Sequence, residues 1–384
     1  MPLPFSFAAP VPLAFGDNRL MKLGRDVKRL AGDGADVLLV TDPVHTGNGL
    51  AERAAGALGE SGHGCSVFSD IASDPAAETV DAISEQARSR GADCIVAMGG
   101  GSTLDAAKLA ACLAPDGRGA ETFALGGTPV PAGGLPKIAV PTTAGTGSEV
   151  TRTSVFSTSE RKLWAWGESL RFNLALLDPL LTVSLPAPLT AATGVDAMVH
   201  AIESATCRRR NPVSSTIALG AIRTLREWLP EAVRHPADTQ ARGHVQIAAT
   251  LAGVAFDVTG VAVAHAIGHA LGQHAGIHHG RAVGLALAAT IEHSAEAAAD
   301  AYSAVSAALG GPEGATARQA SSLYRRFLGD IGFDLTLGEL GERDAGAIAS
   351  LCFEPENMVM LKGDAHEFTP DSLSKTINRM ISAA

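Results

Sequence analysis

The first 180 residues alternate short apolar runs rich in β-branched side chains with amphipathic stretches of helical periodicity. Such alternation predicts a parallel sheet with helices on both faces. The strand-like runs are 35–42, 63–70 and 92–102, the helix-like segments that follow them are 47–61, 76–91 and 103–114, and further strands open 138–156 and 174–188.

The pattern changes after Pro186 and Pro188, where the chain becomes rich in Ala and Leu at helical spacing. A chain of 384 residues is also longer than a single core usually supports. We therefore predict an α/β domain over 1–186 and an all-helical domain over 187–384. The segment 250–272 is long and apolar enough for a membrane span, but it contains Asp257 and two histidines. It is better interpreted as one central helix of the helical domain.

Composition narrows the classes of partner. The formal net charge is −10, and the longest basic run is Arg208–Arg210, so neither nucleic acid nor an anionic membrane is an expected partner. The five cysteines are scattered without a CxxC pair, which indicates reduced, mostly buried thiols in a cytoplasmic protein. The apolar N-terminal sequence "MPLPFSFAAPVPLAFG" lacks a basic start and is interrupted by prolines, so we expect an extended segment of the fold.

A glycine turn follows the third strand, in "CIVAMGGGSTLDAAKLA". Glycines allow close approach of a ligand to the backbone, and the N-terminus of the next helix offers free N–H groups and a positive dipole end. Such a turn suits a pyrophosphate, although an ordinary tight turn has the same sequence. The residues concerned are Gly99, Gly100, Gly101 and Ser102.

A second strand-to-loop segment, "IAVPTTAGTGSEVTRTSVF", is crowded with hydroxyls that can donate to phosphate or ribose, and the two loops together favour a nucleotide site. The hydroxyl residues are Thr142, Thr143, Thr146, Ser148 and Thr151. Asp42 ends the first strand, where an acid can accept bonds from ribose hydroxyls and repel a 2′-phosphate. This favours NAD over NADP, unless Asp42 only forms a turn before Pro43.

Five histidines lie within "AHAIGHALGQHAGIHHG", residues 264–280, which is otherwise free of charge. His265 and His269 are four residues apart, as are Asp196 and His200 in "GVDAMVHAIES", so each pair shares a helix face. Three further histidines, His274, His278 and His279, follow in a glycine-bearing turn. One carboxylate and several imidazoles suit Fe²⁺ or Zn²⁺, whereas any one pair alone is more often a satisfied core histidine or an ion pair.

Together, "GGGSTLDAAK", "PTTAGTGSEVT", "GVDAMVHAIES" and "AHAIGHALGQHAGIHHG" resemble the iron-containing (group III) alcohol dehydrogenase family in order and spacing. The resemblance implies a dinucleotide-binding α/β domain followed by an all-α metal-binding domain, the architecture also found in dehydroquinate synthase. It implies a homodimer, NAD and one divalent metal, with Fe²⁺ favoured and Zn²⁺ possible.

The same resemblance assigns roles to individual residues. The metal ligands would be Asp196, His200, His265 and His279, and His269 would be a catalytic residue beside the nicotinamide. His274 and His278 match no family position and are expected to be surface or loop residues. The cofactor would contact Asp42, Gly100, Gly101, Ser102, Thr142, Thr143 and Thr151, and also Lys162 and Leu181, which the residues themselves do not suggest.

The resemblance implies a metal-dependent oxidoreductase that moves a hydride between a small alcohol or carbonyl compound and NAD(P). Alternatives within the family are a maleylacetate reductase and a hydroxy-acid dehydrogenase. A dehydroquinate synthase-type lyase would need several Lys and Arg residues around the metal motifs, which are almost absent. A nucleotide- or metal-binding protein without catalysis is the remaining alternative. Trp164 and Trp166 stand where smaller residues are expected, so the resemblance does not determine the identity of the substrate.

Overall fold

The computed structural model describes residues 5–8, 11–159, 161–337 and 340–382. These residues form two compact units. The α/β unit contains residues 11–143 and Ser148–Thr182. The helical unit contains residues 5–8, Ala144–Gly147 and 183–382. The change of unit after Thr182 lies four residues before the end of the predicted first domain, and the short loop 144–147 belongs to the helical unit.

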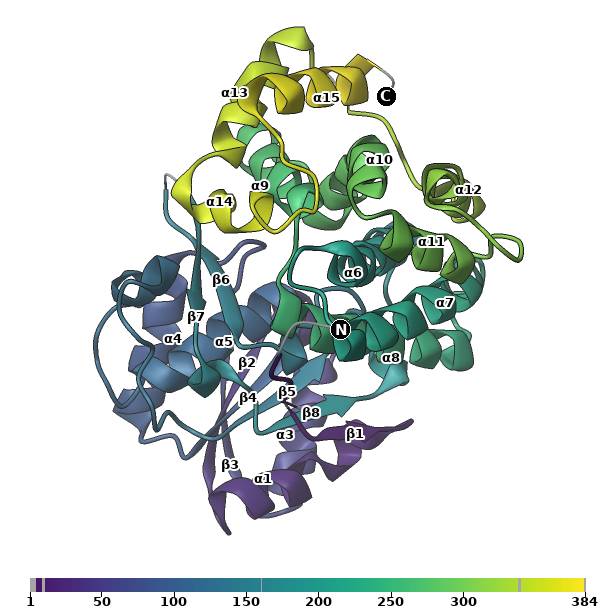
Figure 1. The fold of residues 1–384 in the computed structure, drawn as a ribbon. Helices are drawn as coiled ribbons and strands as arrows, with labels where there is room; N and C mark the ends of the chain where they lie inside the picture. Colours follow the sequence, from purple (N-terminus) through teal and green to yellow (C-terminus); the bar gives the residue numbers. More distant parts are fainter. Residues whose placement is uncertain (1–4, 9–10, 160, 338–339, 383–384) are drawn as a thin grey trace. The chain divides into compact units, whose positions relative to one another are not determined.

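A six-stranded, wholly parallel sheet forms the centre of the α/β unit, in the order β1-β8-β5-β4-β2-β3 (Figure 1). The central strands are continuous apolar runs, as expected for strands covered on both faces. In β4, for example, all six residues are buried. The strands are β1 (Leu13–Phe15), β2 (Asp36–Thr41), β3 (Gly64–Phe68), β4 (Cys94–Gly99), β5 (Lys137–Pro141) and β8 (Leu174–Leu177).

Helices follow the strands as the sequence predicts, and the predicted α/β class is confirmed. The first and third helices pack Leu23, Val27 and Leu58 into one core with the sheet residues Leu39 and Val96. The helices of this unit are α1 (Leu23–Ala31), α2 (Pro43–Gly47), α3 (Leu50–Gly59), α4 (Ala77–Arg90) and α5 (Gly101–Leu113).

A separate antiparallel hairpin was not predicted from the sequence. Its strands, β6 (Thr153–Ser157) and β7 (Lys162–Trp166), pair Thr153 with Trp166 and Val155 with Trp164. Trp166 is 48% exposed, and the guanidinium of Arg152 lies 4.5 Å from its ring centre. The two tryptophans that depart from the expected pattern therefore belong to one face of this hairpin.

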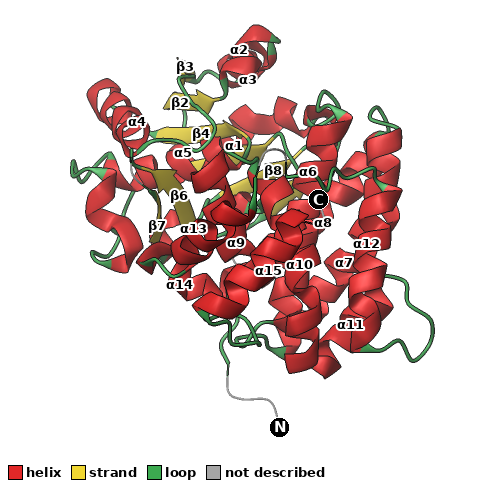
Figure 2. Cartoon of the chain, turned by 90° about the horizontal axis from the view of Figure 1, so that it is seen from above, coloured by secondary structure: helices red, strands yellow, loops and turns green. Residues whose placement is uncertain are grey.

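The helical unit consists entirely of helices and connecting segments within the described residues (Figure 2), so the predicted all-α class is also confirmed. Several helices start at strong sequence signals. Asn211 caps the helix that begins at Pro212, and Asp238 caps the next one. The helices are α6 (Ala187–Thr206), α7 (Pro212–Arg234), α8 (Thr239–Thr259), α9 (Val263–Ala275), α10 (His279–Ala297), α11 (Ala299–Ala308), α12 (Ala320–Asp330), α13 (Glu342–Cys352), α14 (Pro355–Leu361) and α15 (Pro370–Ser382).

The prediction of one central helix over 250–272 is wrong. The chain breaks after Thr259, where Gly260 has a φ of 70°, and α8 and α9 meet at 103°. Within the described chain no single helix is long and apolar enough to span a membrane, although this bent pair passes the test by length and composition.

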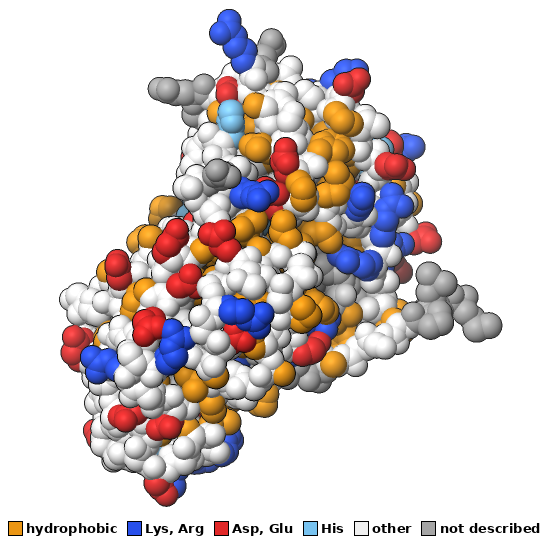
Figure 3. All heavy atoms as spheres, turned by 90° about the vertical axis from the view of Figure 1, so that its left-hand side faces the viewer, with side chains coloured by type: hydrophobic (Ala, Val, Ile, Leu, Met, Phe, Trp, Pro, Cys, Tyr) orange, Lys and Arg blue, Asp and Glu red, His pale blue; other side chains and the backbone are white. Residues whose placement is uncertain are grey.

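Surface charge and cysteine burial agree with the composition. On the face shown in Figure 3, acidic and basic side chains are interspersed. All five cysteines are free thiols, and Cys65 is exposed while the other four are buried.

Close packing of α6 against α10 supplies a test of the fold. A Cβ added to Gly280 would collide with the carbonyl oxygen of Ala192 on α6. We expect Gly280→Ala to lower the free energy of unfolding by about 1–3 kcal/mol, because the two helix backbones must separate. Gly220 on α7 is the matched control, since a Cβ there meets nothing within 4 Å. Gly220→Ala should leave stability unchanged or raise it by up to about 1 kcal/mol. Urea denaturation measures both, and equal effects would contradict the close packing.

Candidate active site

Three helices of the helical unit bring the predicted metal ligands together. Asp196 and His200 lie on α6, His265 lies on α9, and His279 is the first residue of α10. Ligand atoms of Asp196, His265 and His279 all lie within 4.8 Å of one another. The cluster therefore joins residues that are up to 83 positions apart in the sequence.

The carboxylate oxygen Oδ1 of Asp196 is the centre of this cluster. It lies 3.7 Å from Nδ1 of His200, 3.7 Å from Nε2 of His265 and 3.6 Å from Nε2 of His279. These distances are too long for hydrogen bonds. Asp196 Oδ1, His200 Nδ1 and His265 Nε2 are all buried and have no hydrogen-bond partner among the described residues.

Unsatisfied buried polar atoms are costly, so several that converge on one point indicate a ligand that they share. Around one ion with bonds of about 2.1 Å, tetrahedral ligand atoms lie about 3.4 Å apart, close to the 3.6–3.7 Å between Asp196 Oδ1 and each of the three imidazole nitrogens. One carboxylate with three imidazoles is also a donor set suited to Fe²⁺ or Zn²⁺. The residues present therefore fit a divalent metal.

Burial and charge act in opposite directions on these groups. Burial would raise the pKa of the Asp196 carboxyl, but His200 and His279 outweigh it and hold that pKa well below its usual range. Burial likewise favours a neutral His265, but the Glu203 and Asp196 carboxylates raise its pKa to about 9. The site thus strongly favours positive charge at its centre, as expected for a place that binds a cation.

His200 is held by its neighbours on both faces. Its ring stacks on His265 at 4.4 Å and on Phe256 at 4.3 Å. Burial lowers its pKa to about 4, so this imidazole is neutral at physiological pH. A neutral ring is the form that binds metals.

The remaining histidines of the cluster differ in position. His269 lies one turn after His265 on α9, is partly exposed, and has its ring centre 5.4 Å from that of His279. His274 is in the last turn of α9, where it pairs with Asp344 at 2.8 Å. His278 is exposed just before α10. His274 and His279 thus belong to helix ends rather than to the predicted turn.

In the α/β unit, the glycine turn lies at the carboxyl end of β4, directly before α5. The N-cap residue of α5 is Gly100, which has no side chain to cap the helix. A Cβ on Gly99 would collide with Asp42 and Thr103, so only glycine fits there. The Asp42 carboxylate accepts bonds from the Gly100 N–H at 3.2 Å and from the Thr103 hydroxyl at 2.5 Å. Its oxygens retain lone pairs for further donors.

The second predicted loop divides between the two units. Thr142 and Thr151 are buried, whereas Thr143 and Thr146 are partly exposed. Thr143 lies beside Gly100, because a Cβ there would be 3.5 Å from its methyl group. Thr146 belongs to the helical unit, in which Gly145 packs against Thr193 of α6.

The two cofactor residues that only the resemblance suggests have different surroundings. Lys162 pairs with Asp74, whose backbone N–H donates to the Ser102 hydroxyl at 3.3 Å. This chain of contacts connects the hairpin to the glycine turn. Leu181 is buried in the sheet core, so its backbone rather than its side chain is available to a ligand.

Comparison with known proteins agrees with this geometry. Residues 10–179 match the model of the iron-containing alcohol dehydrogenases, and residues 190–375 match the C-terminal domain of the Fe-containing alcohol dehydrogenase family. The chain belongs to the iron-containing alcohol dehydrogenase family. It is a nicotinamide-linked oxidoreductase that interconverts an alcohol and its aldehyde or ketone.

Individual relatives show the extent of the similarity. Long-chain-alcohol dehydrogenase 1 of Geobacillus thermodenitrificans is 37% identical over 85% of this chain and 84% of its own. The NAD-dependent methanol dehydrogenase of Bacillus methanolicus is 34% identical over 68% of each chain. The solved structure of sulfoacetaldehyde reductase from Bifidobacterium kashiwanohense in complex with NAD⁺ has a TM-score of 0.90 and 29% identity, covering all of both chains.

Sequence reasoning missed several residues that hold this dehydrogenase's candidate site. Glu203 on α6 contacts His265, and the signal was available, since Glu203 lies seven residues, or two helical turns, after Asp196. Lys108 on α5 is fully buried and donates to the carbonyls of Ser148 and Thr153 at 2.8 and 2.7 Å, which holds the second loop. Nothing in the sequence indicates the role of Asp74, because its partners Ser102 and Lys162 are 28 and 88 residues away.

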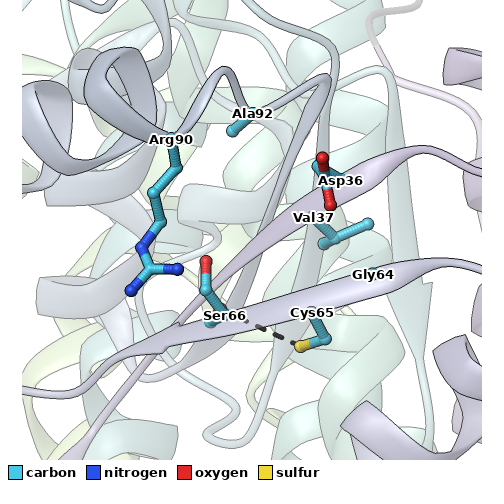
Figure 4. Close-up of a pocket in the computed structure, with 7 residues that line it drawn as sticks. All are labelled: Asp36, Val37, Gly64, Cys65, Ser66, Arg90 and Ala92. Carbon is cyan, nitrogen blue, oxygen red and sulfur yellow. Dashed lines mark hydrogen bonds between the residues drawn. The ribbon is translucent and has the colours of Figure 1, made fainter.

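A hollow at the amino-terminal ends of two strands of the dehydrogenase's sheet is a less suitable cofactor site (Figure 4). It lies at the first residues of β2 and β3, whereas Asp42 and the glycine turn follow the last residues of β2 and β4. Ligands of open parallel sheets bind at the carboxyl ends of the strands. The hollow therefore lies away from the predicted cofactor residues. Its lining residues are Asp36, Val37, Gly64, Cys65, Ser66, Arg90 and Ala92.

Proposed function

We propose that Asp196, His200, His265 and His279 bind one divalent metal and that this site, with NAD, oxidises an alcohol or reduces the corresponding carbonyl compound. The observation that carries the proposal is the Asp196 oxygen with three imidazole nitrogens at 3.6–3.7 Å and no hydrogen bond to any of them. When bound, a divalent metal acts as a Lewis acid that lowers the pKa of an alcohol and polarises a carbonyl.

The residues of the chain have separate tasks in this reaction. The four ligand side chains would hold the metal, and the stacked rings of Phe256, His200 and His265 bury one side of that place and limit access of water to it. His269 is one turn from His265 and partly exposed, so its imidazole can take the alcohol proton and pass it to solvent. The reverse reaction uses the same proton route in the opposite direction.

For the cofactor, we assign the pyrophosphate to Gly99–Ser102 and the N-terminus of α5, whose N-cap residue is a glycine. Thr142, Thr143, Thr146, Thr151, Lys162 and Leu181 surround the rest of the molecule in this proposal. NAD supplies the acceptor of the hydride. Asp42 makes NAD the preferred form, because its carboxylate repels the 2′-phosphate of NADP.

The kind of metal, the oligomeric state and the location are proposed from the family, the surface and the composition. Fe²⁺ is the favoured metal, with Zn²⁺ as the alternative that the ligand set also allows. We propose a homodimer, supported by the edge strand β1, on which Leu13 and Phe15 are each 49% exposed. A cytoplasmic location, and the absence of nucleic acid or membrane partners, stay predictions from composition.

A substrate panel tests the activity. The relatives named above act on long-chain alcohols, methanol and sulfoacetaldehyde, so the panel should include uncharged and anionic compounds of different length. The enzyme reconstituted with Fe²⁺ or Zn²⁺ is assayed by NADH absorbance. A dehydroquinate synthase-type lyase or a non-catalytic binding protein would give no turnover with any of these compounds.

The metal ligands can be tested by measuring the metal content of variants rather than their activity. We expect about one divalent metal per chain in the parent, and loss of most of it in Asp196→Ala, His200→Ala and His279→Ala, because each removes a bond to the ion. His274→Ala is the matched control, since this histidine is in the same segment but pairs with Asp344. Elemental analysis that finds the same metal content in all variants would overturn the site.

Cofactor preference tests Asp42. We expect a higher kcat/KM with NAD than with NADP, and a narrowed or reversed preference in Asp42→Gly, because the repulsion of the 2′-phosphate is lost. Asp36→Asn is the control, as Asp36 is at the other end of β2. A parent enzyme that prefers NADP would contradict the assignment.

The role of His269 is separable from metal binding. We expect His269→Ala to retain its metal while kcat falls by roughly tenfold or more, as is common when acid–base assistance is lost. Turnover and metal content are measured together between about pH 6 and pH 10, so that proton transfer through the imidazole is tested over a wide range of pH. A variant that binds metal normally and turns over like the parent throughout this range would show that His269 only packs.

A further inference from the structure

Glu203 is a buried carboxylate near the end of α6, on the same helix as Asp196 and His200. It is only 2% exposed, and its carboxylate hydrogen-bonds to α9 and to Ala262, the residue that precedes α9. Oε2 accepts hydrogen bonds from Nδ1 of His265 at 2.6 Å and from the N–H of Ala262 at 2.8 Å. Oε1 accepts from the N–H of Ala264 at 2.7 Å.

We propose that Glu203 is a positioning residue of the metal site, which fixes both the tautomer of His265 and the N-terminus of the helix that carries it. This inference rests on the metal site proposed above. A carboxylate can only accept hydrogen bonds, so Nδ1 of His265 must carry the proton. In a neutral ring, the lone pair then lies on Nε2, the atom that is 3.7 Å from Asp196 Oδ1 and has no hydrogen-bond partner among the described residues.

The same carboxylate replaces a missing helix cap. The N-cap residue of α9 is Ala262, which has no side chain able to accept a bond, and no cap from a side chain of α9 itself is present in the described residues. Glu203 satisfies two of the free N–H groups instead, and its negative charge lies at the positive end of the helix dipole. Because α9 carries both His265 and His269, this cap sets the position of two predicted active-site side chains at once.

An amide of the same shape cannot satisfy all three donors. If the oxygen of a glutamine faces His265 and Ala262, its NH₂ group faces the N–H of Ala264 and the cap is lost. If the amide is turned round, its NH₂ donates to Nδ1 of His265, and the proton moves to Nε2, where it blocks a metal. Glu203→Gln therefore separates the charge and acceptor function of this residue from its volume.

The matched control is Asp364, a second buried carboxylate at the same helix end. Its carboxylate lies close to the backbone of Val263, the first residue of α9, and accepts bonds from the N–H of His366 at 2.8 Å and from the hydroxyl of Ser294 at 2.9 Å. Within the described residues, the hydrogen bonds of its carboxylate go to Ser294 and His366 and not to His265. Asp364→Asn thus alters the charge at the N-terminus of α9 without altering the partner of a predicted ligand.

The experiment measures metal affinity in the purified full-length protein after removal of metal by a chelator. Zn²⁺ is titrated in competition with a chromophoric chelator, and Co²⁺ is used to record the visible ligand-field bands. We expect Glu203→Gln to weaken Zn²⁺ binding by about 10- to 100-fold, as is typical when the partner of a metal-binding histidine is lost. The Co²⁺ bands should shift, and Asp364→Asn should bind within about threefold of the parent with unchanged bands.

Equal weakening in Glu203→Gln and Asp364→Asn would show that Glu203 acts only as a helix cap, and unchanged affinity and bands in Glu203→Gln would also overturn the proposal. If Glu203→Gln does not fold, Glu203→Asp decides by the same criteria, because its shorter side chain cannot reach both His265 and Ala264. Failure of the metal site itself is distinguishable. In that case the parent would bind no Zn²⁺, or Asp196→Ala would bind it as tightly as the parent.

Discussion

The site depends on a single buried oxygen. Asp196 Oδ1 is surrounded at 3.6–3.7 Å by nitrogens from three histidines and forms no hydrogen bond with any of them. A buried carboxylate is expensive unless a cation compensates it, so this arrangement is stable only with positive charge at its centre. Two features of the helical unit serve this condition. Gly280 allows α10 to approach α6 closely, and the rings of Phe256, His200 and His265 stack on one another beside the oxygen.

In the α/β unit, side chains hold the loops that we propose as the cofactor site. The Asp42 carboxylate accepts a hydrogen bond from the Gly100 N–H. Lys108 donates hydrogen bonds to the carbonyls of Ser148 and Thr153, which fixes the second loop. These contacts use polar groups that would otherwise be unsatisfied, and they fix the loop conformation before any ligand binds. Preorganised loops lower the entropy that ligand binding costs.

Much of this could be predicted from the sequence, and the limits have physical causes. The parallel sheet and the helical second half follow from periodicity, which is a local property. Asp196 and His200 share a face because the helix repeat requires it. The meeting of His265 and His279 with Asp196 is a tertiary contact that no spacing determines, and it came from resemblance. The hairpin β6–β7 was missed because the strand signal of Val155 and Phe156 is interrupted by polar residues and glycine nearby. Glu203 was missed because its partner His265 is 62 residues away in the sequence, which makes their contact a tertiary one that local spacing does not determine.

The wrong prediction of one continuous helix over 250–272 concerns the residues that lie next to the proposed metal site. Local propensity favours one helix through this apolar run, and an unbroken helix would use the N–H groups of Ala262 and Ala264 for bonds to the carbonyls of Val258 and Gly260. Glu203 could then accept neither of them. The break at Gly260, with its positive φ, creates the free helix end that this carboxylate needs, only three residues before His265. The local preference for a continuous helix is therefore overridden where a buried charge, a helix end and a predicted metal ligand have to meet. Functional sites of enzymes are where such conflicts between local and tertiary demands are expected.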